Sequence, residues 1–171
     1  PDGGTAPGRL GLVQAFGNTA DLDAGTDKLS DADALRAWLV ERGLMAINQP
    51  TDGADLKHAV ALREAIRGAI GANSGGLVYP VDVATMNGAV SASLLVPRFG
   101  PGGKARLEPH AEGVEVALGR TVAAVFAAMN DQAWTGLKSG GSAACRWVSH
   151  PRSPPDASRR RTTAPCGNPP P

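Results

Sequence analysis

Residues 55–76 read DLKHAVALREAIRGAIGANSGG, and this stretch decides the fold class. An apolar stripe with the spacing of one helical face runs through it: Ala59, Leu62, Ile66, Ala69 and Ile70. Asp55 stands where a helix cap is expected, and the stretch ends in Asn73, Ser74 and two glycines, which are residues that stop helices. The pattern predicts a long amphipathic helix that buries the stripe.

The other side of this predicted helix is charged, with Lys57, Arg63, Glu64 and Arg67 on an outward face. Glu64 precedes Arg67 by three residues, which is the spacing of a weak helical ion pair. Arg63 and Arg67 lie one turn apart, so their guanidinium groups can hold an anion together if they face a cleft. We expect either a solvated face or, together with Asn18, a binding site for a small anionic ligand.

The flanking sequence predicts further helices and one hairpin. Ser30 and Asp33 begin a segment that buries Trp38, and Asp82 opens a shorter helix. Two strands, 92–98 and 104–109, are separated by the turn-forming residues 99–103. The last helix, 112–134, carries an apolar side made of Leu118, Val122, Val125, Phe126 and Met129. We therefore expect a mainly α domain with a small β-hairpin and two strands in total.

Composition excludes several classes of protein. The 171 residues include 17 Lys and Arg against 16 Asp and Glu, so the chain as a whole has no strong electrostatic field. Two cysteines cannot form a disulfide framework, and no stretch approaches the roughly 20 apolar residues of a membrane span. His58 and His110 lie in no catalytic motif. We expect a cytoplasmic protein that is not an enzyme.

The positive charge is concentrated at the end of the chain. Residues 149–171 carry a net charge of +3 and seven of the 14 prolines, with almost nothing apolar to bury. Such a tail is expected to be extended or disordered unless something holds it. Its arginines are either a solvated charge run or contacts to the phosphates of a nucleic acid: Arg152, Arg159, Arg160 and Arg161.

Several segments together resemble a known family. Residues 16–21 read FGNTAD, similar to a Phe-x-Asn-Thr motif, and residues 62–67 read LREAIR, similar to a helix of that family. The hairpin and the long last helix follow in the same order. The chain thus resembles the bacterial family that joins an N-terminal ABATE domain to a C-terminal CGNR zinc finger, described as putative stress-induced transcription regulators. On the residues alone, Asn18 and Thr19 are more typical of hydrogen bonds to a neighbouring helix than of ligand contacts.

The zinc finger of that family has the pattern C-x4-C-x15-C-x4-C, which falls here on Gly140, Cys145, Arg161 and Cys166. Two of the four ligand positions are therefore lost, although the register is kept and residues 166–168 still read CGN. Structural zinc supplies folding free energy on the order of 10 kcal/mol. We expect Cys145 and Cys166 to be remnant ligands, with no cofactor bound. An open site of these two with His150 is the alternative.

The resemblance implies an ABATE-like helical domain over residues 8–136 and a degenerate, partly disordered finger over 137–171. It also implies a transcription regulator that binds DNA through the C-terminal segment, weakened here by the lost zinc ligands. The alternative is a helical module that binds a ligand or partner without DNA. The sequence does not specify an operator, an effector or an oligomeric state.

Overall fold

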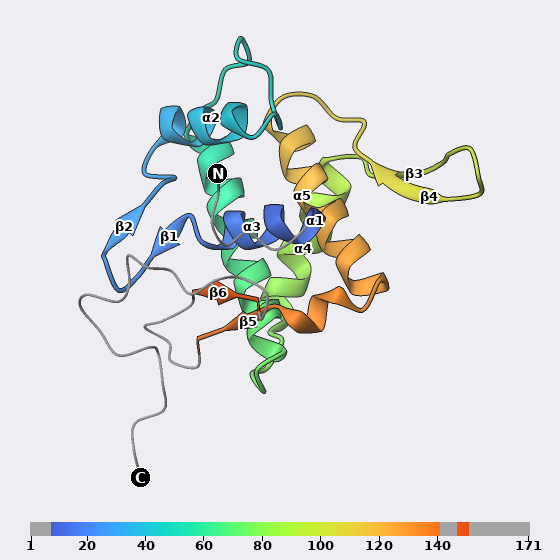
Figure 1. Ribbon diagram of the computed structural model, residues 1–171. Helices are drawn as coiled ribbons and strands as arrows, with labels where there is room; N and C mark the ends of the chain where they lie inside the picture. The colour runs from blue at the N-terminus through green and yellow to red at the C-terminus, as the bar shows by residue number, and fades with distance from the viewer. Residues whose placement is uncertain (1–7, 141–146, 151–171) are drawn as a thin grey trace.

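The computed structural model describes residues 8–140 and 147–150 of the chain. Most of this part is helical, which confirms the mainly α fold class (Figure 1). The helices follow the chain in this order: α1 (Arg9–Gly17), α2 (Ala32–Glu41), α3 (Gly53–Ala72), α4 (Pro80–Ala92), α5 (Val114–Asn130) and the short 3-10 helix η1 (Ala133–Gly136).

The described residues form three separate two-stranded antiparallel sheets rather than one hairpin. They are β1 (Ala20–Asp21) with β2 (Thr26–Asp27), β3 (Val96–Phe99) with β4 (Ala105–Glu108), and β5 (Lys138–Ser139) with β6 (Val148–Ser149). The middle pair confirms the predicted hairpin, with Phe99 in the strand rather than the turn. The predicted strand start at residue 92 was wrong, because residues 92–95 are the end of α4 and the turn after it. The expectation of two strands in total was wrong, because two-residue strands are too short to show an alternating pattern.

Helix α3 is the centre of the core. Its predicted apolar stripe is buried throughout, and α1, α2, α4 and α5 all contact it. Trp38 on α2 is also buried as expected, and its ring lies 5.6 Å from that of Phe16 on α1. The guanidinium of Arg42 covers the Trp38 ring at 4.5 Å. Because four other helices pack against α3, the position of its apolar stripe determines how these helices are arranged.

The helix starts differ from the predicted ones by a few residues. Asp31, not Ser30, caps α2 and accepts from the Ala34 amide. Asp52, not Asp55, caps α3, and Asp55 is the third residue of a capping box. Helix α4 begins with Pro80 rather than at Asp82. A proline at the first helical position fits because its missing N–H has no helical partner to lose.

The end of α5 corrects a second expectation. The helix stops at Asn130, and the side chains of Phe126 and Met129 are exposed rather than buried. The buried positions in this part of the helix include Ala124 and Ala128. Alanine contributes little to a hydrophobic pattern. The prediction therefore followed the larger side chains of Phe126 and Met129 and placed the buried face of the helix there. Earlier in α5, Leu118, Val122 and Val125 are buried as predicted.

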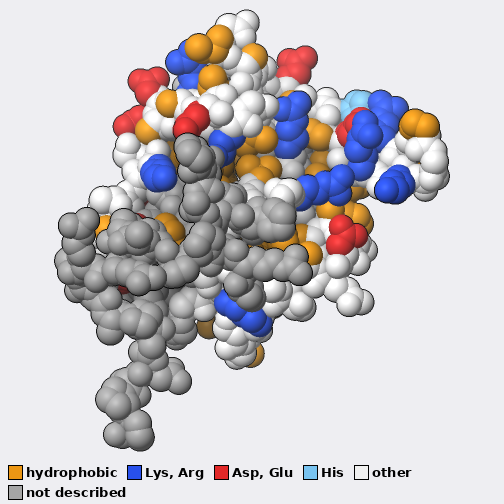
Figure 2. Space-filling view, viewed as in Figure 1, with side chains coloured by type: hydrophobic (Ala, Val, Ile, Leu, Met, Phe, Trp, Pro, Cys, Tyr) orange, Lys and Arg blue, Asp and Glu red, His pale blue; other side chains and the backbone are white. Residues whose placement is uncertain are grey.

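The hairpin β3–β4 projects from the helical body on the side away from β1–β2 (Figure 1). Lys and Arg side chains gather over this projection in the space-filling view (Figure 2). Its base packs on α5 at Gly119, where an added Cβ would lie 2.5 Å from Cβ of Ser93 and 2.9 Å from that of Pro109. Within the described ranges, no helix has the length and apolar character needed to cross a membrane.

The helix caps predict part of the acid sensitivity of the fold. Hydrogen bonds from backbone amides lower the pKa of Asp31 and of Asp52 below their ordinary value of 3.8, with Ser30 adding to the effect at Asp31. A lowered pKa in the folded state gives stability that is present above the unfolded value and is lost as pH falls through the folded value. Asparagine caps a helix without titrating.

The double variant D31N D52N should therefore lose less thermal stability than the native chain between about pH 4 and pH 2. Thermal melts followed by circular dichroism across this range measure the difference. D131N, at an exposed carboxylate just after α5, is the control and should follow the native curve. Identical acid profiles for the double variant and the native chain would contradict the assignment.

Candidate functional site

The Phe-Gly-Asn-Thr motif lies at the end of α1, where the first helix meets α3 and strand β6. Phe16 faces the core, whereas Asn18 and Thr19 follow the last helical residue and face other segments of the chain. The motif therefore links three elements that are far apart in the sequence. We call it, with the residues that it contacts, the α1 junction.

The side-chain amide of Asn18 forms two hydrogen bonds with the main chain of Val148. Its Oδ1 accepts a hydrogen bond from the Val148 amide at 2.7 Å, and its Nδ2 donates to the Val148 carbonyl at 2.8 Å. Gln14 Nε2 donates to the same carbonyl at 3.3 Å. Val148 is 0% exposed. The side chain of Asn18 thus makes the pair of bonds that a neighbouring strand would make.

Gly17 provides the space for this contact. A Cβ on Gly17 would lie 2.9 Å from Cγ2 of Val148, closer than non-bonded carbons approach. Glycine therefore lets β6 pack directly on the end of α1. Its place in the motif is explained by close approach rather than by backbone conformation.

A second set of contacts joins the motif to α3 through Arg63. Thr19 Oγ1 donates to the Phe16 carbonyl at 2.8 Å and accepts from Arg63 Nη1 at 3.2 Å. The same Nη1 forms an ion pair with Oδ1 of Asp27 on β2 at 2.7 Å. Arg63 is only 4% exposed. A buried guanidinium needs such partners, because an unpaired charge in the interior is costly.

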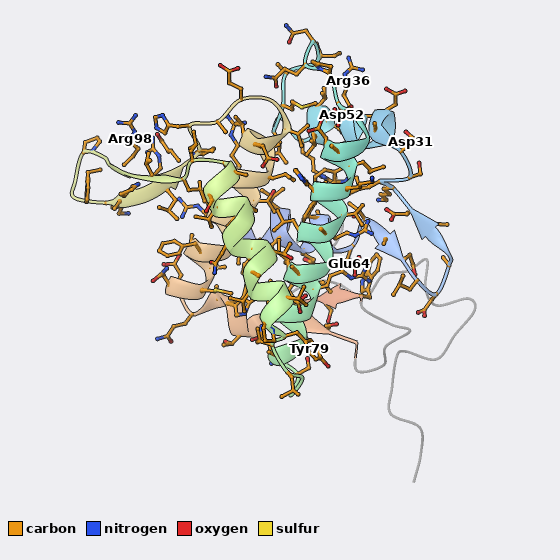
Figure 3. All side chains as sticks on the ribbon, turned by 180° about the vertical axis from the view of Figure 1, so that it is seen from behind. Asp31, Arg36, Asp52, Glu64, Tyr79 and Arg98 are labelled. Atoms are coloured by element: carbon orange, nitrogen blue, oxygen red, sulfur yellow. The ribbon has the colours of Figure 1, made fainter. Side chains whose placement is uncertain are left out.

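Glu64 connects Arg63 to the next arginine on the helix. Its Oε1 lies 2.9 Å from Nε of Arg63 and 3.1 Å from Nη1 of Arg67, which confirms the predicted ion pair between Glu64 and Arg67. Figure 3 shows Glu64 on the side of α3 that faces β1–β2 and β6. Arg67 is only 1% exposed. The expectation of an outward face was wrong for both arginines, because α1 and the two short sheets cover this part of the helix.

The start of the C-terminal segment is fixed at a separate point. Asn73, just after α3, donates from Nδ2 to the carbonyls of Trp134 at 2.8 Å and Leu137 at 3.1 Å. Lys138 Nζ donates to the Asn73 carbonyl at 2.5 Å, and Leu137 is fully buried. Of the segment 137–171, which the sequence predicts to be partly disordered, the structure describes residues 137–140 and 147–150, and the other residues lie outside the described part of the chain.

A comparison with known protein families identifies the family of the chain. A family model named ABATE and described as "Putative stress-induced transcription regulator" matches residues 10–132, from α1 to just beyond α5. The chain belongs to the ABATE family. No curated protein matches the chain. The matched region contains Asn18 and Asn73, so the residues that bind Val148 and Leu137 belong to the family domain.

Several predicted site residues fall outside the part of the chain that the structure describes. These are the four tail arginines and the two remnant zinc ligands: Arg152, Arg159, Arg160, Arg161, Cys145 and Cys166. Gly140, at the first ligand position of the family pattern, follows β5 and donates its amide to the Trp147 carbonyl at 3.2 Å. A glycine and an arginine at two of four positions do not fit a four-thiolate site.

Within residues 8–140 and 147–150, no three His, Cys, Asp or Glu side chains gather as a possible metal site. His150 lies beside η1, where a Cβ on Gly136 would approach its Nε2 to 2.8 Å. The absence of a cofactor and the alternative site at Cys145, His150 and Cys166 both stay predictions.

Asn18, Arg63 and Arg67 do come together at the α1 junction, but in contact with the chain itself. The two guanidinium groups bind carboxylates, and Asn18 binds the main chain of β6. A hollow of about 210 Å³ between α1 and the end of α5 is lined by other residues, among them Arg9 and Asp131. A small anion at the junction therefore stays a prediction, and it would have to compete with Asp27 and Glu64.

Sequence reasoning missed Val148 as the partner of this junction and Asn73 as the second point that holds the C-terminal segment. Helical periodicity identifies which side of α3 is polar, but it does not identify what covers that side. The one available signal was the Phe-Gly-Asn-Thr motif, whose polar residues directly follow an apolar helix.

Replacing Asn18 with alanine should detach β6 from the domain. The N18A variant removes the hydrogen bond to the buried Val148 amide and leaves the Val148 carbonyl with Gln14 alone, which should lower the free energy of unfolding by about 1–3 kcal/mol. Denaturant titration measures the loss, and hydrogen exchange at the Val148 amide should become faster.

The control is N87A, at an exposed position on α4, which should change stability by less than about 0.5 kcal/mol. Unchanged exchange at Val148 in N18A would contradict the proposed role of the Asn18 amide.

Proposed function

We propose that the protein is a transcription regulator that binds DNA through the segment that begins at Leu137, with the ABATE domain as its support. One observation carries the proposal: the domain holds this segment at two points. Asn73 binds its beginning at Leu137, and Asn18 binds the main chain at Val148. The basic sequence of the tail starts four residues after the second point, at Arg152. The helical domain can therefore determine where this sequence begins.

The charge of the tail suits a nucleic-acid backbone. Arg152 and the run Arg159, Arg160 and Arg161 would neutralise phosphates and release counterions. Such contacts position a protein on DNA without reading bases. The family description supports regulation of transcription rather than catalysis. We propose that this activity takes place in the cytoplasm. Sequence preference would have to come from other contacts.

The proposal does not require zinc. We treat Cys145 and Cys166 as remnant ligands. The hydrogen bonds of Asn18 and Asn73 fix parts of the segment in place, as a bound metal does in an intact finger. A structural metal fixes a short segment by joining its ends. Here the described parts of the segment are joined to the domain instead, through buried Leu137 and Val148.

A salt titration of DNA binding tests the role of the tail. In fluorescence anisotropy with a labelled 30-base-pair duplex, R160Q R161Q should reduce the slope of log K against log salt by about two. The matched control is K28Q K57Q, which removes the same charge from exposed positions on the domain. Failure of the native chain to bind any duplex at low salt, or an unchanged slope in R160Q R161Q, would overturn the proposal.

One observation favours a second candidate function, partner binding by the helical body. No residue of α4 is fully buried, and a group of large apolar side chains at its start is exposed: Leu77, Val78, Tyr79, Val81 and Val83. Figure 3 places Tyr79 at the end of α4 that is remote from the hairpin. Exposed apolar clusters are typical of interaction surfaces.

Sedimentation velocity of the native chain distinguishes this candidate. Partner binding through a second copy predicts a dimer at concentrations on the order of 10 μM, and V81D should shift the protein to a monomer because it places a charge in an apolar contact. The exposed substitution N87A is the control. A native chain that sediments as a monomer would contradict self-association through α4.

A further inference from the structure

The β3–β4 hairpin carries an excess of positive charge, whereas the domain as a whole does not carry one. Residues 96–110 include Arg98, Lys104 and Arg106 against the single acid Glu108. The rest of the chain up to residue 148 has more acidic than basic residues. The hairpin also projects from the helical body, and Lys and Arg side chains gather over it (Figures 1 and 2).

The register of the hairpin separates its side chains onto two faces. Arg98 pairs with Arg106, and Phe99 pairs with Ala105. Because successive side chains of a strand point to opposite faces, both guanidinium groups lie on one face and Phe99 on the other. The side chains of Arg98 and Arg106 are more than half exposed, and Phe99 is 81% exposed.

Two like charges directly opposite each other destabilise an antiparallel pair. One carboxylate serves both: Glu108 Oε1 lies 2.5 Å from Nη2 of Arg106, and its Oε2 lies 3.6 Å from Nε of Arg98. His110 Nε2 lies 3.0 Å from Nη2 of Arg98. Lys104, at the end of the turn, is exposed and has no hydrogen bond or ion pair from its side chain among the described contacts. The single negative charge of Glu108 therefore compensates only part of the positive charge of Arg98, Lys104 and Arg106.

We propose that this hairpin is a second DNA contact, in which Arg98, Lys104 and Arg106 bind phosphates and Phe99 packs against bases. The major groove of B-DNA is about 12 Å wide and admits a two-stranded ribbon. In this groove a phenylalanine can make an apolar contact with the methyl group of thymine, while the long arginine side chains of the other face can reach the phosphates at the edges of the groove. The inference shares its ligand with the proposed function but uses residues of the ABATE domain, so it stands or fails separately from the tail.

The same chemistry argues against two other polyanions. Duplex RNA has a deep and narrow major groove, which excludes a ribbon. A membrane surface needs a broad apolar face, whereas the face of Phe99 otherwise presents Pro97, Ala105 and Leu107, of which Leu107 is half-buried. The hairpin therefore fits duplex DNA better than either.

The test uses the full chain and a labelled 30-base-pair DNA duplex, with binding followed by fluorescence anisotropy over a range of salt. R98Q K104Q should reduce the slope of log K against log salt by about two, whereas E108Q, which frees the arginines, should steepen it by about one. F99A should weaken binding about tenfold with an unchanged slope, because it removes an apolar contact with the bases and no charge. Circular dichroism checks that each variant is folded.

The control K28Q K57Q removes the same net charge as R98Q K104Q and should retain more affinity and a steeper slope than that variant. Equal slopes for the two variants, or no tightening in E108Q, would overturn the inference. So would binding to duplex RNA as tight as to DNA, or binding to vesicles with 30% anionic lipid that F99A abolishes.

The tail variant R160Q R161Q separates this inference from the proposed function. A loss in R160Q R161Q alone supports the tail and overturns the hairpin. A loss in R98Q K104Q alone supports the hairpin and overturns the tail. Losses in both, with additive changes in slope, support two contacts on one duplex.

Discussion

The hydrogen bonds between the Asn18 side chain and the Val148 main chain join residues that are 130 positions apart. Their geometry depends on three neighbours. Gly17 leaves space for the Val148 side chain, Gln14 makes a further bond to its carbonyl, and Arg63 binds Thr19 beside it. Without this contact the described end of the chain would be held mainly through Leu137 and Asn73. The ABATE domain and its C-terminal segment thus form one packed unit at this point.

Helix α3 serves the structure in two ways. Its apolar stripe contacts the other helices, and its buried arginines contact the short sheets. Glu64 lies between Arg63 and Arg67 and compensates charge that burial would otherwise make costly. Because these arginines are covered, the helix is almost surrounded along its middle turns. The polar side of α3 is therefore part of the interior, although its composition is that of a surface.

Much of the helical fold could be predicted from the sequence. The stripe from Ala59 to Ile70 has an unambiguous period, and the hairpin has a glycine-rich turn between two short strands. The covered arginines could not be predicted, because periodicity reports only polarity and α1 with β1–β2 supplies the cover. The pairing of β5 with β6 was hidden for another reason: two-residue strands have no alternation, and Asn18, which holds one of them, is a side chain far away in sequence.

The Asn18 amide also has a consequence for solubility. Strands at the border of a sheet expose unpaired N–H and C=O groups, onto which another chain can add and begin an aggregate. In β6 the outward N–H and C=O of Val148 are already occupied by a side chain, which offers no further backbone to extend the ladder. A single amide therefore closes this border of the small sheet, as a covering helix or a proline does in larger proteins.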